Sequence, residues 1–394
     1  MKRLLYIAHR MPYPPDKGER VRAFNEICEL ARNGSDVTVI AGSAGADDYA
    51  SAKKLAEYCS AVETFPIVRR SALVRGACSF IMGRSVSEGY FSSCMAGRKI
   101  RRLGRFDVAV GYSSSVLNLL MKADAARRIM DIVDADSAKW ADYACRTAWP
   151  LKKIFNIESS RVARLERKCV EQCNDVVMVS REEAEILGDG IPNLHVAANG
   201  VDADFFNPSL LSPITGLGEH AMVFTGSMDY RPNAEAVEWF ATEVLPCIRE
   251  KFDNAIFVIV GRNPSKNVRD MAMMEGVRVT GNVVDVRPYI QAAAVSVCPL
   301  HIGRGIQNKV LEAMSMAKAV VVSPQAMSGL DVTQGQDVEL AETSGQWVEK
   351  LLYLLSEADV RNMLGYAARQ CVLEKYSWHA RLKDFVSLCL KDVE

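Results

Sequence analysis

The sequence predicts an α/β protein made of two doubly wound, Rossmann-like halves. Three observations predict it. The chain has 394 residues, which is more than one ordinary hydrophobic core accommodates. Short apolar runs alternate with amphipathic helical segments, as in βαβ units. A stretch rich in Pro, Gly, Ser and Leu at residues 208–218 interrupts the alternation, and a second series of the same kind follows it.

The first half opens with a strand, a loop, a helix and a strand, expected at residues 3–8, 9–18, 19–33 and 36–41. In the helix, apolar residues recur at helical spacing, and Asn33-Gly34 supplies a stop signal. Such a strand–helix–strand unit predicts parallel strands. The alternation continues with strands expected at residues 106–110, 128–133, 176–180 and 194–197, and a charged helix at 160–172.

The second half repeats this pattern. Strands are expected at residues 221–225, 255–260, 277–280, 295–298 and 319–322, and helices at 233–250 and 308–317. Doubly wound sheets bind ligands beyond the carboxyl ends of their strands. Two such halves therefore predict a ligand-binding cleft between the domains.

The composition excludes several classes of protein. Lys and Arg total 48, as do Asp and Glu, and this balance argues against bulk nucleic-acid binding but allows a local cationic pocket. The 11 cysteines form no framework of close pairs, as expected of buried thiols in a reducing cytoplasm. Cys169 and Cys173 lie one helical turn apart without further ligands nearby, so no metal site is expected. No apolar run is long enough for a membrane span, and none resembles a signal peptide, so we expect a cytoplasmic protein.

Residues 299–314 are the most informative stretch. A buried strand ends at Pro299, and Gly303 and Gly305 then allow the backbone to approach a ligand closely. A helix is expected to start near Gln307, where its free amide groups favour an anion. The stretch therefore predicts a phosphate-binding turn.

Two charged residues on that helix sharpen the prediction. Lys309 lies in the first turn, where a cation opposes the helix dipole unless it faces a phosphate. Glu312 follows three residues later on the same face, and a carboxylate can accept hydrogen bonds from both hydroxyls of a ribose. The alternative is an ordinary surface Lys–Glu pair, which contributes little.

A second candidate lies at residues 224–233. Gly226 follows a buried strand, as expected of a glycine that lets a phosphate approach. Asn233 is expected to cap the next helix. Arg231 leads into that cap and could clamp a diphosphate with two hydrogen bonds. Taken alone, an ordinary exposed loop arginine is the better interpretation.

Two places in the first half could also face a ligand. Residues 9–18 contain three prolines and end at Gly18, which opens a helix; the alternative is a connection without a role. Asp134-Ala-Asp136 has the form of a metal signature, but it directly follows a strand. We favour Asp134 in an acceptor or catalytic pocket over metal binding. The chain has no G-x-G-x-x-G after its first strand, no P-loop and no H-E-x-x-H.

Several segments together resemble the family 4 retaining glycosyltransferases of the GT-B fold. Residues 199–208 resemble the segment that enters the interdomain linker, and 260–261 a strand end of the nucleotide domain. Residues 279–285 resemble the base-binding loop, which assigns Gly281 and Val283 to the donor. Residues 309–314 resemble the donor motif, and 376–378 resemble the start of the last helix.

This resemblance implies three parts of the chain. Residues 1–207 would form an acceptor-side domain, and residues 208–375 a donor domain for the nucleotide sugar. Residues 376–394 would form a final helix that crosses back to the first domain.

A narrower resemblance links the chain to the sugar transferases of bacterial exosortase/PEP-CTERM systems. Residues 14–22, 131–137 and 303–309 carry it. It implies a role in exopolysaccharide biosynthesis, with a saccharide or lipid-linked acceptor, at the inner face of the membrane. The family usually has two glutamates eight positions apart. Here Glu312 is the second, and Arg304 replaces the first, so the role of contacting the donor sugar does not carry over.

The resemblance implies a retaining, metal-independent hexosyltransferase that uses a nucleotide-diphosphate sugar and no cofactor. The departing diphosphate would be stabilised by Arg231, Lys309, Arg304 and the backbone near Gly18. The alternatives are a nucleotide-sugar epimerase of the same fold and a non-catalytic sugar-nucleotide-binding protein.

One further segment suggests contact with a membrane. Residues 71–84 mix apolar side chains with arginines and have no acid, and Arg69 and Arg70 precede them. Such a stretch could rest on an anionic bilayer. The alternative is a core helix with a basic edge.

Overall fold

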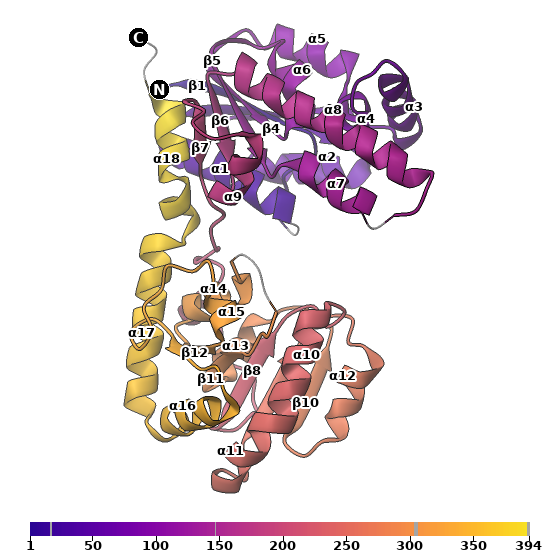
Figure 1. Ribbon diagram of the computed structural model, residues 1–394. Helices are drawn as coiled ribbons and strands as arrows, with labels where there is room; N and C mark the ends of the chain where they lie inside the picture. The colour runs from indigo at the N-terminus through magenta and orange to yellow at the C-terminus, as the bar shows by residue number, and fades with distance from the viewer. Residues whose placement is uncertain (16–17, 146, 303–305, 392–394) are drawn as a thin grey trace. The chain divides into compact units, whose positions relative to one another are not determined.

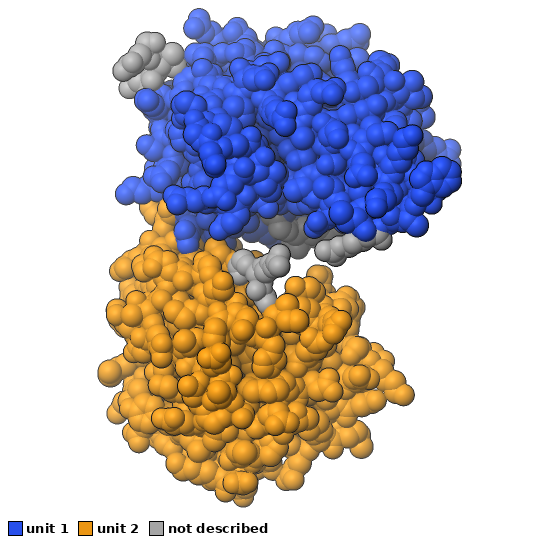
Figure 2. Space-filling view, in the orientation of Figure 1, with its two compact units in different colours: residues 1–200, 381–394 blue, residues 201–380 orange. Residues whose placement is uncertain are grey.

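The computed structural model describes residues 1–15, 18–145, 147–302 and 306–391. The chain divides into two compact units, unit 1 (Met1–Gly200 with Arg381–Glu394) and unit 2 (Val201–Ala380), coloured separately in Figure 2. Each is an α/β unit with one parallel sheet (Figure 1).

Unit 1 contains a seven-stranded parallel sheet in the order β3-β2-β1-β4-β5-β6-β7. Its strands are β1 (Arg3–Ala8), β2 (Asp36–Ser43), β3 (Ala61–Pro66), β4 (Arg105–Tyr112), β5 (Asp124–Val133), β6 (Asp175–Met178) and β7 (Leu194–Val196). Its helices are α1 (Gly18–Arg32), α2 (Ala46–Leu55), α3 (Arg69–Ile81), α4 (Val86–Phe91), α5 (Cys94–Arg102), α6 (Leu117–Leu120), α7 (Asp136–Cys145), α8 (Leu151–Gln172) and α9 (Arg181–Leu187).

Unit 2 contains a six-stranded parallel sheet in the order β10-β9-β8-β11-β12-β13. Its strands are β8 (Ala221–Thr225), β9 (Ile256–Val260), β10 (Val277–Gly281), β11 (Val295–Cys298), β12 (Ala319–Val322) and β13 (Glu339–Leu340). Its helices are α10 (Arg231–Trp239), α11 (Leu245–Lys251), α12 (Lys266–Asp270), α13 (Arg287–Ala292), α14 (Asn308–Ser315), α15 (Pro324–Met327), α16 (Ser344–Ser356) and α17 (Ala358–Lys375). The last helix, α18 (Trp378–Leu390), carries the chain from unit 2 into unit 1.

The central strands are buried on both faces, as doubly wound sheets require. Every residue of β8, β11 and β12 is buried, and so are Leu4 to Ala8 of β1. In each sheet the strand order reverses beside the first strand, between β1 and β4 and between β8 and β11. These reversals are where doubly wound sheets bind ligands, beyond the carboxyl ends of the strands.

The structure confirms the expected strands of both halves and the expected helices at the start of the chain and at residues 308–317. The single helix expected at residues 233–250 is instead α10, a π-helical turn at Phe240–Val244 and α11. Pro246 lies in the first turn of α11 and lacks the N–H that an uninterrupted α-helix would use there.

Unit 2 begins earlier than the expected domain boundary after residue 207. The Val201 N–H donates to the Tyr376 carbonyl oxygen (2.7 Å), and Val201 forms an isolated bridge with Ser377. Val201 and Ala203 are buried in the core of unit 2. This burial joins the segment after Gly200 to unit 2.

Candidate functional site in unit 2

The loops that follow β8 and β9 touch through two glycines. The Gly226 N–H donates to the Val260 carbonyl oxygen (3.0 Å). A Cβ atom on Gly261 would lie 1.7 Å from the Gly226 carbonyl oxygen, and one on Gly226 would lie 2.8 Å from Asn233 Nδ2. Any side chain at Gly261 would therefore push the two loops apart. This tight contact lies beside the point where the strand order of the sheet reverses.

Lys309 of α14 reaches the same place from the other side of the reversal. Its ammonium donates to Asn233 Oδ1 (2.5 Å) and lies 4.8 Å from the ring centroid of Phe224, in β8. Asn233 Nδ2 in turn donates to the Ser227 carbonyl oxygen (2.9 Å). One chain of contacts thus joins α14, α10, β8 and the loop after β8.

The sequence assigned Asn233 to the helix cap, and this was wrong. Tyr230 is the N-cap residue of α10, and Asn233 lies in the first turn with a buried side chain. The side-chain amide of Asn233 instead bridges Lys309 and the loop after β8. No spacing rule indicates this pairing, because the two residues are far apart in the chain.

The electrostatics of this site favour an anionic ligand. Burial lowers the pKa of Lys309, an effect that Cys298 and Glu312 oppose. Burial also raises the pKa of Glu312 to about 7, against the influence of Lys309. Within the part of the chain that the structure describes, no carboxylate forms an ion pair with Lys309. A half-buried ammonium without a carboxylate partner is suited to bind a phosphate.

Among the described contacts, Arg231 pairs along its own helix and takes no part in the Lys309–Asn233 hydrogen bond. Arg231 is the first residue of α10, and its side chain is 85% exposed. Its Nε donates to Glu235 Oε1 (2.6 Å), four residues along the same helix. A ligand would have to attract Arg231 away from this exposed pair, whose contribution to stability is small.

Arg262 is a cation of this edge that the sequence analysis did not assign. It follows Gly261 directly, and its Nε donates to Ser227 Oγ (3.0 Å) in the loop after β8. In the sequence, a glycine followed by an arginine after a buried strand could have indicated that Arg262 belongs to this site. The hydrogen bond to Ser227 thus places Arg262 beside the contact between Gly226 and Gly261.

The predicted base-binding residues lie at the end of β10. Gly281 has φ +69°, a conformation that favours glycine, and no atom would contact a Cβ placed on it. Val283 is partly buried and packs against a cluster that includes Leu217 and Val260. The predicted residues Gly303, Arg304 and Gly305 lie outside the described residues.

In unit 1, two segments of the narrower resemblance contact each other. Arg22 Nε donates to Asp131 Oδ2 (2.7 Å) and lies 2.9 Å from Glu26 Oε1, and all three side chains are buried. The Arg22 guanidinium also donates to the Ala197 carbonyl oxygen (2.7 Å). This buried cluster holds α1, β5 and the chain before unit 2 together, which is an architectural role.

The remaining predicted residues of unit 1 lie near the ends of the same elements. Gly18 begins α1. Asp134 follows β5, and its Oδ2 accepts a hydrogen bond from Lys139 Nζ (2.8 Å). In the described chain no group of three His, Cys, Asp or Glu side chains could hold a metal ion.

His9 is the first residue of the loop at residues 9–18, and the sequence analysis gave it no role of its own. It follows β1 at the strand reversal, stacks on Tyr112 and lies 3.6 Å from Glu19 (Nε2 to Oε2). The hydrogen bond from His9, helped by Arg10, lowers the pKa of Glu19 to about 2. The carboxyl edge of the first sheet therefore carries an ionised carboxylate beside an imidazole.

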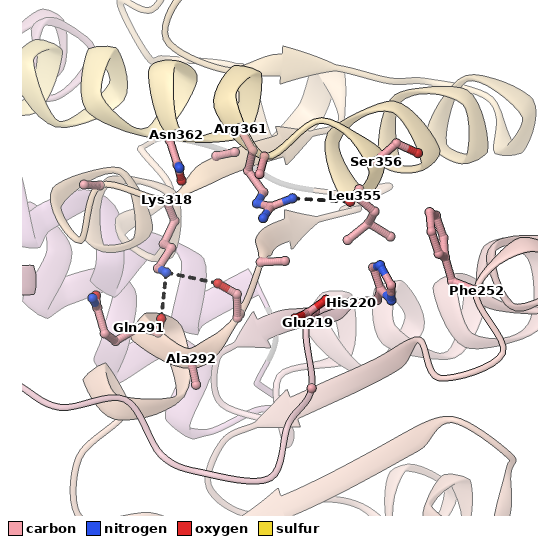
Figure 3. A pocket seen from close by; sticks show the side chains of 16 residues that line it. Glu219, His220, Phe252, Gln291, Ala292, Lys318, Leu355, Ser356, Arg361 and Asn362 are labelled. Atoms are coloured by element: carbon pink, nitrogen blue, oxygen red, sulfur yellow. Dashed lines mark hydrogen bonds between the residues drawn. The ribbon is translucent and has the colours of Figure 1, made fainter.

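A hollow of about 760 Å³ lies at the opposite, amino edge of the sheet in unit 2 (Figure 3). Lys318 donates to the carbonyl oxygens of Gln291 (2.7 Å) and Ala293 (3.0 Å), at the end of α13. Arg361 donates to the Leu354 carbonyl oxygen (2.7 Å), near the end of α16. Both cations thus satisfy helix C-termini, and we place the functional site at the carboxyl edge instead.

Comparisons with known proteins relate the chain to glycosyltransferases. Residues 219–357 match the family model described as Glycosyl transferases group 1, a range that contains the glycine contact, Lys309 and Glu312. No curated protein matches the sequence.

Solved structures of glycosyltransferases resemble the whole chain. TarM does so with a TM-score of 0.64 at 11% identity, covering 99% of both chains. Anabaena HepE, solved with UDP, has a TM-score of 0.62 at 11% identity, covering 98% of this chain and 99% of its own. Sucrose-phosphate synthase from Thermosynechococcus elongatus has a TM-score of 0.60 at 14% identity, covering 98% of both chains. The protein therefore has the GT-B fold, with two Rossmann-like domains, as the sequence predicted.

Proposed function

We propose that the protein is a retaining, metal-independent glycosyltransferase that moves a hexose from a nucleotide-diphosphate sugar to a saccharide or lipid-linked acceptor. The observation that carries the proposal is the half-buried Lys309 at the strand reversal of unit 2, inside the segment that matches Glycosyl transferases group 1. The complexes of HepE with UDP and UDP-glucose support a nucleotide-sugar donor by analogy.

In this proposal the main chemical task is to stabilise the departing nucleoside diphosphate. Lys309 would exchange Asn233 for a phosphate oxygen, and the first amides of α14 would face the same charge. Glu312 would accept hydrogen bonds from the ribose hydroxyls. Arg231 would rotate from Glu235 to the diphosphate, and Arg262 is a second exposed cation beside the loop.

The finer assignments rest on the sequence motifs. We assign the protein to family 4 and, within it, to the sugar transferases of exosortase/PEP-CTERM systems, in exopolysaccharide biosynthesis. Gly281 and Val283 would contact the base, and Gly226, Gly18 and residues 303–305 would line the donor. Asp134 would lie in the acceptor pocket once its pair with Lys139 opens. We place the enzyme in the cytoplasm at the inner face of the membrane.

A panel of nucleotide sugars tests the proposal. Each donor is incubated with the protein, with and without oligosaccharide and lipid-linked acceptors, and the products are separated by mass spectrometry and NMR. We expect transfer, or slow donor hydrolysis, with an α-linked donor giving an α-linked product. Isomerisation of a donor without acceptor would indicate an epimerase, and binding without turnover a non-catalytic protein.

The same assay tests metal independence. We expect unchanged turnover in excess chelator, because the proposed charge stabilisation uses Lys309 and helix amides. Activity that vanished in chelator and returned with magnesium or manganese would contradict this part of the proposal.

A further inference from the structure

Three large apolar side chains of helix α3 in unit 1, Leu73, Val74 and Ile81, are exposed. The buried residues of this helix are small: Ala72, Gly76 and Ser79. A Cβ on Gly76 would lie 3.0 Å from Val86 Cγ1, and one on Gly89 would lie 2.3 Å from Ser79 Cβ, so α3 and α4 pack closely through these small residues. This arrangement contradicts the alternative of a core helix with a basic edge.

Helix α3 and the start of α8 lie at the same end of unit 1 (Figure 1). Both helices and the residues beside them carry exposed apolar side chains. Ile81, Trp149 and Met82 are 83%, 80% and 73% exposed. Further exposed members are Val68, Leu73, Val74, Leu151 and Ile154. Together with the cations described next, these residues form the apolar–basic surface.

Arg161 fixes the two parts of this surface to each other. Its guanidinium donates to the carbonyl oxygens of Phe80 (2.5 Å) and Arg84 (3.2 Å) and lies 4.2 Å from the Phe80 ring centroid. Glu158 of α8 accepts a hydrogen bond from the Val86 N–H (2.8 Å) at the start of α4. The surface is therefore continuous within one compact unit.

The charge of the surface has one sign. Residues 68–84 contain four arginines and no acid, and residues 149–164 contain four cations and one acid, Glu158, which is buried. Glu88 lies 3.7 Å from Arg84 and is itself largely buried. A hollow of about 520 Å³ is lined by Trp149, Lys152, Lys153, Asn156, Ile157, Ser160, Arg161 and Arg164. The excess of positive charge on this surface is local, because the whole chain has no net charge.

We propose that the apolar–basic surface docks unit 1 on an anionic lipid bilayer. Exposed apolar groups enter the boundary between headgroups and acyl chains, the indole of Trp149 suits that boundary, and Lys and Arg face anionic headgroups. Charge complementarity selects this occupant, since an acidic protein surface would leave the apolar side chains without apolar partners. Within the described residues no helix is long and apolar enough to cross a membrane, so the contact is peripheral.

The inference deepens the proposed function, because a lipid-linked acceptor would be met at such a bilayer, but the binding does not depend on transfer activity. The test is co-sedimentation of the full chain with vesicles of phosphatidylcholine alone or mixed with phosphatidylglycerol. We expect binding to the anionic vesicles, weakened by salt. No binding to them at low salt would overturn the proposal.

Two variants locate the contact. The first reverses charge on α8 (Lys152→Glu with Lys153→Glu), and the second removes apolar groups near α3 (Ile81→Ser with Met82→Ser). Each should lower the vesicle partition coefficient roughly tenfold or more, because the first removes attraction to anionic headgroups and the second removes apolar groups from the membrane boundary.

A matched control reverses two exposed charges of unit 2 (Lys266→Glu with Arg278→Glu), which changes the net charge equally and should leave binding close to that of the unchanged chain. Equal effects of all variants would overturn the assignment of the surface. So would lipid-free self-association that the α8 variant abolishes, because the occupant would then be a second copy. Transfer to a free oligosaccharide, measured in parallel, separates a failed surface from a failed function.

Discussion

At the scale of the residue, Lys309 decides whether the site in unit 2 performs chemistry. We predict that Lys309→Ala lowers turnover roughly 10²-fold, because it removes a preorganised cation from the developing diphosphate charge. Binding of the free nucleoside should change less. Steady-state kinetics, with melting temperature as the folding control, measures this. Near-normal turnover in a folded variant would mean that Lys309 belongs to an ordinary polar contact with Asn233.

Glu312 should make donor binding depend on pH. Burial raises the pKa of its carboxyl group to about 7, so the group takes up a proton as the pH falls through this value. The ionised form is the better acceptor for two ribose hydroxyls. We therefore predict that nucleotide affinity weakens below pH 7.

The Glu312→Gln variant is the control for this pH dependence. It should bind more weakly at pH 8 and show a flatter profile. Calorimetric titration between pH 5.5 and 8 measures both proteins, and parallel pH profiles would contradict the ribose role.

The raised pKa of Glu312 also affects stability. The folded chain binds this proton more tightly than the unfolded chain, whose carboxyl pKa is 4.5. The contribution is thus fully present below the unfolded value and is lost as the pH rises through about 7. Glu312→Gln should remove that part of the pH dependence, which denaturant unfolding at several pH values would detect.

Some features of the candidate site could be predicted from the sequence and others could not, and the roles of Lys309 and Glu312 stay predictions. Lys309 and Glu312 stood out because a cation in the first turn opposes the helix dipole and because the two residues share a helix face. The bridge through Asn233 depends on two helices that meet only in the folded sheet. The exposed pair of Arg231 with Glu235 likewise reflects a rotamer, which spacing cannot specify.

At the scale of the element, the loops after β8 and β9 depend on their glycines. We predict that Gly261→Ala destabilises the protein by about 1–3 kcal/mol and weakens nucleotide binding, because its Cβ would meet the Gly226 carbonyl oxygen. Gly345→Ala is the matched control, since no atom lies within 4 Å of its Cβ position. Denaturant unfolding and nucleotide titration of both variants test this, and equal behaviour would exclude a tight contact.

Helices and strands could be predicted from the sequence where the apolar pattern and the turn residues indicated the same limits. The strands β8, β11 and β12 have continuous apolar runs bounded by turns, and their predicted limits match the structure. The edge strand β3 was missed, because Ala61–Pro66 is short, contains Glu63 and is mostly not buried. The π-helical turn before α11 was missed because helical periodicity continues across it.

At the scale of the whole molecule, the chain has no net charge, but positive charge is concentrated at particular places in each unit. Unit 1 carries the apolar–basic surface, and unit 2 carries the half-buried ammonium of Lys309. From the sequence, the balanced total charge argues against bulk nucleic-acid binding. It could not locate either feature, since both depend on which side chains the fold exposes.

The C-terminal residues complete unit 1. Arg127 donates to the Leu388 carbonyl oxygen (2.9 Å), and Leu382, Phe385 and Cys389 of α18 are fully buried. We predict that Phe385→Ala lowers the stability of unit 1 by about 3–5 kcal/mol, the usual cost of deleting a buried ring. Hydrogen exchange followed by mass spectrometry distinguishes the units: protection should fall in unit 1 and persist in unit 2. Ser387→Ala, on an exposed position of the same helix, is the control. Equal loss of protection in both units would mean that α18 stabilises the molecule as one cooperative body.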